Sequence, residues 1–176
     1  DGNRDGVIAD LKNALKEDEY LNGNIKTLLI IVDADEDLKK CFKSVQDALY
    51  NRKDKTFNIP KKLGVIEQSD ITKIGVGVFL LPDCKEKGSL ETLCLQALKH
   101  TKSEEKMKCV ENYFQCLNSK KIDTQNHNHA SKSKFRVFMA TPNPDKSGGY
   151  TKNIIDNIDF NSTALDPLAK FLKSAE

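Results

Sequence analysis

Two aspartates lie directly after an apolar run near the start of the chain. The run from Leu28 to Val32 is unbroken and contains three β-branched residues, and Asp33 and Asp35 follow it. Such a run suits a strand that is buried on both faces, as in a parallel sheet covered by helices. If the strand persists, Asp33 and Asp35 share one face. Paired carboxylates repel each other unless a cation lies between them, so this DxD pattern predicts a site for Mg²⁺ or Mn²⁺.

A second pair of acids is expected at the same place. Asp83 follows the apolar run from Ile74 to Leu81, and Glu91 falls in the first turn of the helix that comes next. The carboxyl ends of neighbouring parallel strands meet at one edge of a sheet, where open α/β sheets bind their ligands. The predicted metal ligands are therefore Asp33, Asp35 and Asp83. Either Asp83 or Glu91 would complete the coordination shell or act as the catalytic base.

Each of these acids also has a structural interpretation. Asp33 and Asp35 could begin and solubilise the following helix, because acids favour a helix N-terminus. Asp83 could form an Asx-turn, and Glu91 could complement the helix dipole. For Glu91 taken alone, the structural interpretation is the favoured one.

Other polar groups carry weaker signals. His127 and His129 form an HxH pair without a third ligand nearby, so a solvated loop is favoured over a metal site. Three basic residues at alternate positions precede or enter an apolar run: Lys132, Lys134 and Arg136. In a strand they would all point to one side, where they could meet a phosphate or protect the strand edge. The sequence contains neither a Gly-rich phosphate loop nor a nucleophile elbow.

Apolar periodicity predicts the elements that must position these residues. We expect one α/β domain over residues 1–176, with a central, mostly parallel sheet and helices on both faces. One or two further strands would come from residues 56–67 or from upstream sequence. The strands are predicted at 27–33, 74–81 and 134–140, and the helices at 5–17, about 38–52, 89–98, 103–118, 151–157 and from 166 onward.

The composition sets few limits on function. Lys and Arg total 28 and Asp and Glu total 26, so the net charge of +2 does not by itself indicate nucleic acid or membrane binding. No apolar run approaches the ~20 residues of a transmembrane helix, and no signal peptide is visible. Five cysteines, an odd number without a CxxC pair, favour a reducing cytoplasm over a disulfide framework. Neither the substrate nor the oligomeric state follows from the sequence.

The order of these features resembles a bacterial family of unknown function with a Toprim-like fold. Toprim domains occur in topoisomerases, primases and OLD-type nucleases. The similarity implies a Rossmann-like sheet with a DxD site for Mg²⁺, and Asp33 and Asp35 match that DxD. The matching stretches are IKTLLIIVDADED, VGVFLLPDCKEKGSLETLCLQAL, MKCVENYFQCL and IDFNSTALDPLAKFLK.

The chain departs from the Toprim pattern at its beginning. Toprim domains carry a Glu on their first strand as a general acid or base, and this chain shows no such strand. We therefore expect the Toprim-type Glu upstream of Asp1. The expected function is Mg²⁺-dependent phosphoryl transfer on nucleic acid, similar to a nuclease. The alternative is a non-catalytic module that uses the same fold to bind nucleic acid or a protein.

Overall fold

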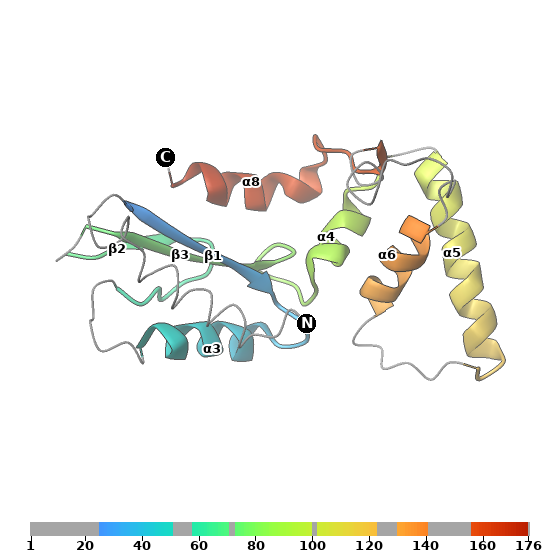
Figure 1. Cartoon of the computed structure of the whole chain (residues 1–176), viewed down its shortest axis with the longest axis horizontal. Helices are drawn as coiled ribbons and strands as arrows, with labels where there is room; N and C mark the ends of the chain where they lie inside the picture. The colour runs from blue at the N-terminus through green and yellow to red at the C-terminus, as the bar shows by residue number, and fades with distance from the viewer. Residues whose placement is uncertain are drawn as a thin grey trace.

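The chain forms an α/β fold in which helices surround a small sheet (Figure 1). The computed structural model describes residues 25–50, 58–70, 73–99, 102–122, 130–140 and 156–175. The predicted helix at 5–17 and the His127–His129 pair lie outside these ranges, as does most of the helix predicted at 151–157. The elements are β1 (Thr27–Asp33), α3 (Leu38–Tyr50), β2 (Ile66–Gln68), β3 (Gly75–Leu81), α4 (Leu90–Gln96), α5 (Lys102–Ser119), α6 (Ala130–Ala140), the 3-10 helix η2 (Thr163–Leu165) and α8 (Asp166–Lys173).

The described sheet has three strands in the order β1-β3-β2. β1 runs parallel to β3, with Asp33 paired to Leu81, while the short β2 runs antiparallel to β3. The predicted strands at 27–33 and 74–81 are confirmed to within one residue. The expectation of a mostly parallel sheet is corrected to a mixed one, because the strand from the 56–67 region returns antiparallel along the free edge of β3.

β3 is the central strand, and all seven of its residues are buried. It has a strand on each side and a helix on each face, which is the environment that an unbroken apolar run requires. In β1 only Ile30 is fully buried, and Ile31 remains 38% exposed. The strand that carries the aspartates is thus less covered than its sequence predicts, because among the described strands it pairs only with β3.

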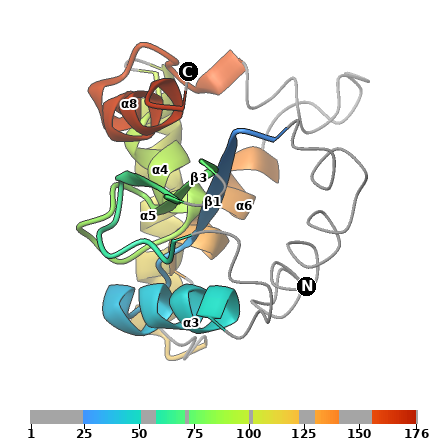
Figure 2. The same cartoon turned by 90° about the vertical axis from the view of Figure 1, so that its left-hand side faces the viewer.

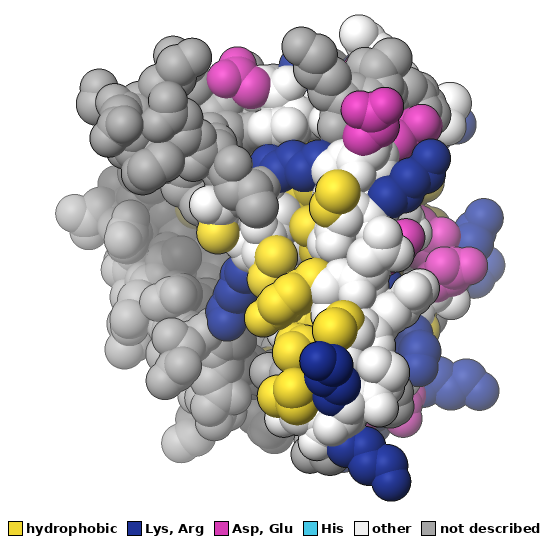
Figure 3. Space-filling model, turned by 90° about the vertical axis from the view of Figure 1, so that its right-hand side faces the viewer, with side chains coloured by type: hydrophobic (Ala, Val, Ile, Leu, Met, Phe, Trp, Pro, Cys, Tyr) yellow, Lys and Arg dark blue, Asp and Glu magenta, His cyan; other side chains and the backbone are white. Residues whose placement is uncertain are grey.

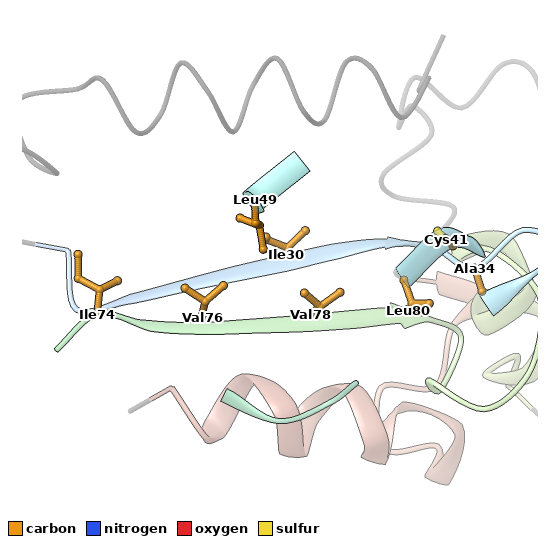
Figure 4. Close-up of a cluster of buried hydrophobic side chains, with 8 residues drawn as sticks. All are labelled: Ile30, Ala34, Cys41, Leu49, Ile74, Val76, Val78 and Leu80. Atoms are coloured by element: carbon orange, nitrogen blue, oxygen red, sulfur yellow. The ribbon is translucent and has the colours of Figure 1, made fainter. Parts of the chain in front are cut away.

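Alternate residues of β3 supply two cores. Val76, Val78 and Leu80 face α3 and pack with its residues Cys41 and Leu49 (Figure 4). Phe79 and Leu81 point to the opposite face, where the ring of Phe79 lies 5.2 Å from that of Phe171 in α8. Figure 2 shows the sheet between α3 and α8. The prediction of helices on both faces therefore holds for the described part of the chain.

The prediction of a third strand at 134–140 is wrong, because residues 130–140 form helix α6. The run FRVFMA places apolar residues both at period two and at helical spacing, and a short run of this kind does not decide between strand and helix. Helix formation buries Phe135, Phe138 and Met139 together, in a cluster with Val110 of α5. Burial of three large side chains on one helical stripe outweighs the strand propensity of Phe and Val.

Helices α4, α5 and α6 form a layer beyond the carboxyl ends of β1 and β3 (Figure 1). The main contacts of α6 are with α4 and α5. Within the described ranges, none of the helices combines the length and hydrophobicity of a membrane-spanning segment. Helices therefore lie next to the carboxyl ends of β1 and β3, where the predicted site residues are located.

The close approach of Phe171 to Gly77 of β3 can be tested by substitution. A Cβ on Gly77 would lie 2.8 Å from Cε2 of Phe171, so Gly77→Ala should destabilise the fold by about 1–3 kcal/mol through overpacking. Urea unfolding measures this change. In a Phe171→Leu background the cost of Gly77→Ala should fall, because the ring that it meets is gone. Equal costs in both backgrounds would contradict the contact.

Candidate functional site

Asp33 is the last residue of β1, and each of its carboxylate oxygens has a partner from a different helix. Oδ1 accepts a hydrogen bond of 2.9 Å from the backbone N–H of Leu90, the first residue of α4. Oδ2 lies 3.1 Å from Nζ of Lys132 on α6. The Asp33 and Lys132 side chains are 29% and 28% exposed, so the pair is partly withdrawn from water. One carboxylate thus joins the sheet to both helices.

Asp35 also lies at this end of the sheet, but its backbone is not in the extended conformation that was expected. The strand ends at Asp33, and Asp35 adopts a left-handed conformation with φ of 50°. Aspartate tolerates this region better than most residues. The N–H of Asp35 donates a 2.8 Å hydrogen bond to the carbonyl of Gly88. Period-two alternation therefore does not hold from Asp33 to Asp35, and the link to Gly88 positions Asp35 beside α4 instead.

The loop before α4 is shaped by Gly88 and Ser89. Gly88 has φ of 153°, and a Cβ there would lie 2.8 Å from Oγ1 of Thr92. Ser89 is the N-cap of α4, and its N–H donates to Thr92 Oγ1 at 3.1 Å. Its hydroxyl donates to Oε2 of Glu91 at 2.7 Å. Ser89 therefore fixes the direction of the Glu91 carboxylate.

The Lys132 ammonium is the electrostatic centre of this group. Burial alone lowers the pKa of Lys132, but the hydrogen bond and charge of Asp33 and the charges of Glu91 and Asp35 raise it by more, so the net pKa shift is upward. Three carboxylates therefore act on one cation. Sequence reasoning selected all three acids and also selected Lys132, but it placed Lys132 just before a predicted strand, either to meet a phosphate or to protect the strand edge.

A small cavity of about 110 Å³ opens beside this ion pair. Its walls carry both signs of charge together with three hydroxyl groups. A cavity of this size has room for several water molecules. Lys87, Thr92 and Ser131 line the cavity, and the sequence analysis did not single them out. The lining residues are Asp35, Glu36, Lys87, Gly88, Ser89, Thr92, Ser131 and Lys132.

Asp83, Lys134 and Arg136 are the predicted site residues that lie outside this group. Oδ1 of Asp83 accepts hydrogen bonds of 2.9 Å from the N–H groups of Lys85 and Glu86, which is the arrangement of an Asx-turn. Asp83 is not among the lining residues of the cavity, and its role as a ligand stays a prediction. Lys134 lies 3.9 Å from Glu111 of α5, and Arg136 is exposed. On a helix, Lys132, Lys134 and Arg136 do not all share one side.

The side chains of the site are of the type that binds a hard cation, but within the described residues too few of them lie close together to surround one. Carboxylate oxygens are the ligands that Mg²⁺ and Mn²⁺ prefer, and Asp33 and Asp35 would supply them. In the described part of the chain, no three acidic, histidine or cysteine side chains lie close enough together to hold a metal ion. The ammonium of Lys132 already contacts the Asp33 oxygen that a metal would use.

The chain belongs to the family described as a protein of unknown function (DUF3226), which it matches over residues 1–176. No curated protein and no solved structure matches it significantly. The resemblance to an uncharacterised family is thereby confirmed.

The contacts of Asp33 predict its contribution to stability. Asp33→Ala removes the acceptor for the Leu90 N–H and the partner of Lys132, and should lower the free energy of unfolding by about 1–2 kcal/mol. Asp33→Asn retains an oxygen for the N–H and should cost less. Urea denaturation measures both changes. The matched control is Asp47→Ala, which removes a carboxylate from an exposed i,i+4 pair with Lys43 and should stay within about 0.5 kcal/mol. Equal effects at positions 33 and 47 would contradict the account.

Proposed function

We propose that this protein catalyses Mg²⁺-dependent phosphoryl transfer on nucleic acid, as a nuclease with a Toprim-like site. The observation that carries the proposal is the cavity beyond the carboxyl end of β1. Asp35 and Lys132 both line this cavity, and Asp33 forms an ion pair with Lys132. Open α/β sheets place their ligands at such an edge. Carboxylates suit the metal and ammonium groups suit the phosphate, so a site for a metal-bound phosphodiester needs both kinds of side chain.

Each side chain has a distinct role in this proposal. Asp33 and Asp35 would hold the metal, which would supply Lewis-acid chemistry at the scissile phosphate. Glu91, held by the Ser89 hydroxyl, would complete the coordination shell or act as the general base. Lys87 lies in the cavity wall and would contact a phosphate oxygen. Asp83 is the alternative to Glu91, and its engagement in a turn makes Glu91 the stronger candidate.

The second candidate function is a non-catalytic module that binds a protein or a nucleic acid. The observation that favours it is a band of apolar side chains on the surface at the α5 end of the molecule (Figure 3). Tyr113 of α5 is 50% exposed, and its ring packs edge-to-face on Phe114 with 5.3 Å between the ring centroids. Half-exposed aromatic residues are common at protein interfaces. Under this function, the Asp33–Lys132 pair would be purely structural.

The cytoplasm remains our expected compartment for either function. None of the five cysteines, all of which lie within the described residues, forms a disulfide, which suits a reducing environment.

Thermal melting with and without metal separates the two functions. At a free Mg²⁺ or Mn²⁺ concentration of ~100 times the dissociation constant, binding to the native state adds about 2.7 kcal/mol, or roughly 5–10 °C in melting temperature. The double variant Asp33→Asn, Asp35→Asn should lose this response. The control Asp47→Asn removes an exposed carboxylate on α3 and should keep it. An unchanged melting temperature of the unsubstituted protein in metal and in chelator would rule out the metal site.

Cleavage of nucleic acid tests the reaction itself. Supercoiled plasmid and a labelled single-stranded oligonucleotide, incubated with Mn²⁺, should be cut by the unsubstituted protein and by Asp47→Asn. Glu91→Gln should bind metal but cleave at least about 100-fold more slowly, because general-base catalysis contributes about that much or more. Metal binding without cleavage of either substrate would favour the non-catalytic module.

A further inference from the structure

We propose that this protein forms a symmetric dimer through helix α5, with the outer face of α5 packed antiparallel against the same face of a second copy. α5 (Lys102–Ser119) lies at the end of the described structure opposite β2 (Figure 1). The inference uses none of the residues of the candidate site. It therefore goes beyond the proposed function, and each can fail without the other.

The side chains of α5 divide between a buried side and an exposed one. Val110 is buried with residues of α6, and Met107 and Phe114 are partly buried beside it. Elsewhere on the helix, five exposed side chains follow each other at helical spacing. Successive residues of an α-helix are about 100° apart, so these five lie within an arc of about 80°. They form the outer face: Glu105, Cys109, Tyr113, Cys116 and Lys120.

Lys120 belongs to the outer face although it follows the last residue of α5. Its N–H donates to the carbonyl of Cys116 at 3.2 Å, so helical geometry continues through it. Lys121 has φ of 51° and ends the helix. The outer face thus begins with an acid in the first turn and ends with a base after the last turn. The helix dipole favours these charges within one chain, but it does not account for the exposed Cys, Tyr and Cys between them.

The order of residues on the outer face is complementary to its own reverse. In a two-fold interface, contact of one residue with a second implies the reciprocal contact. When the axis passes beside Tyr113, Cys109 faces Cys116 of the second copy, and Glu105 faces Lys120 of the second copy. Each pair occurs twice. A helix that is acidic at one end, basic at the other and apolar between them therefore fits a second copy of itself.

Charge selects the antiparallel orientation. Parallel helices would place Glu105 against its own copy and Lys120 against its own copy, and like charges repel. Antiparallel helices replace both repulsions by attraction. Charged pairs at the rim of an interface decide orientation and partner more than they add affinity.

The centre of the outer face supplies the apolar contact. Tyr113 is 50% exposed, and Cys109 and Cys116 are exposed on either side of it. Aromatic residues are enriched in interface cores, and a free cysteine behaves as a small hydrophobe. One helix face buries less area than a permanent dimer needs, so the expected dimer is weak and reversible.

Oxidative cross-linking tests the register of the two helices. When helices pack about 8–10 Å apart, facing Cα atoms lie within about 6 Å, a separation that a disulfide spans. Copper phenanthroline takes two electrons and two protons from a pair of thiols. It should convert the unsubstituted protein to a covalent dimer on a non-reducing gel. Cys109→Ser alone and Cys116→Ser alone should each lose this dimer. An equimolar mixture of the two variants should recover it, because the mixed dimer keeps one facing cysteine pair.

Two results of the cross-linking would overturn the arrangement. The first is a lack of covalent dimer in the unsubstituted protein. The second is a covalent dimer of Cys109→Ser alone, because Cys116 would then face its own copy, as in parallel helices.

Sedimentation equilibrium tests the charge pairing. Glu105→Lys and Lys120→Glu should each weaken the dimer at least about tenfold, because both opposite-charge contacts become like-charge contacts. An equimolar mixture of the two variants should associate as tightly as the unsubstituted protein, since the mixed dimer again has opposite charges at both ends. The matched control is Lys173→Glu, the same charge change at an exposed position of α8, which should leave association unchanged.

The sedimentation experiment can also overturn the dimer itself. An unsubstituted protein that stays monomeric at millimolar concentration would do so, and would leave the outer face to a different protein. A mixture that associates no better than the single variants would overturn the pairing of Glu105 with Lys120.

Discussion

The Asp33 carboxylate is the polar contact that links the end of the sheet to both helices of the candidate site. It ends β1, accepts the first N–H of α4 and pairs with Lys132 of α6. The N–H is one of the groups that a helix start leaves without an intrahelical partner, so its bond to a distant carboxylate fixes where α4 begins. The cavity lies beside this ion pair, and its lining residues come from the start of α4 and from α6.

Asp33 can serve this purpose because β1 pairs along its whole length with a fully buried strand, β3. Every residue of β3 is buried, and β1 is in register with it up to the pairing of Asp33 with Leu81. The N–H of Ala34 continues the ladder by donating to the Leu81 carbonyl at 3.1 Å. The chain then turns at Asp35, whose left-handed backbone places it against Gly88. The same backbone contacts that end the sheet thus bring Asp33, Asp35 and the start of α4 together.

Sequence reasoning recovered what local patterns determine and failed where distant parts of the chain meet. Continuous apolar runs located β1 and β3, and Glu91 was correctly placed in the first turn of α4. The run at 134–140 fits both periods, so only the burial of Phe135, Phe138 and Met139 against the neighbouring helices selects a helix. The pairing of Lys132 with Asp33 follows from that helix, and no local signal at either residue could reveal it.

The most direct test of the account is a crystal structure of the protein soaked with Mn²⁺, with the metal located by its anomalous scattering. The account predicts one anomalous peak in contact with carboxylate oxygens of both Asp33 and Asp35. The absence of an anomalous peak at these two aspartates would contradict it.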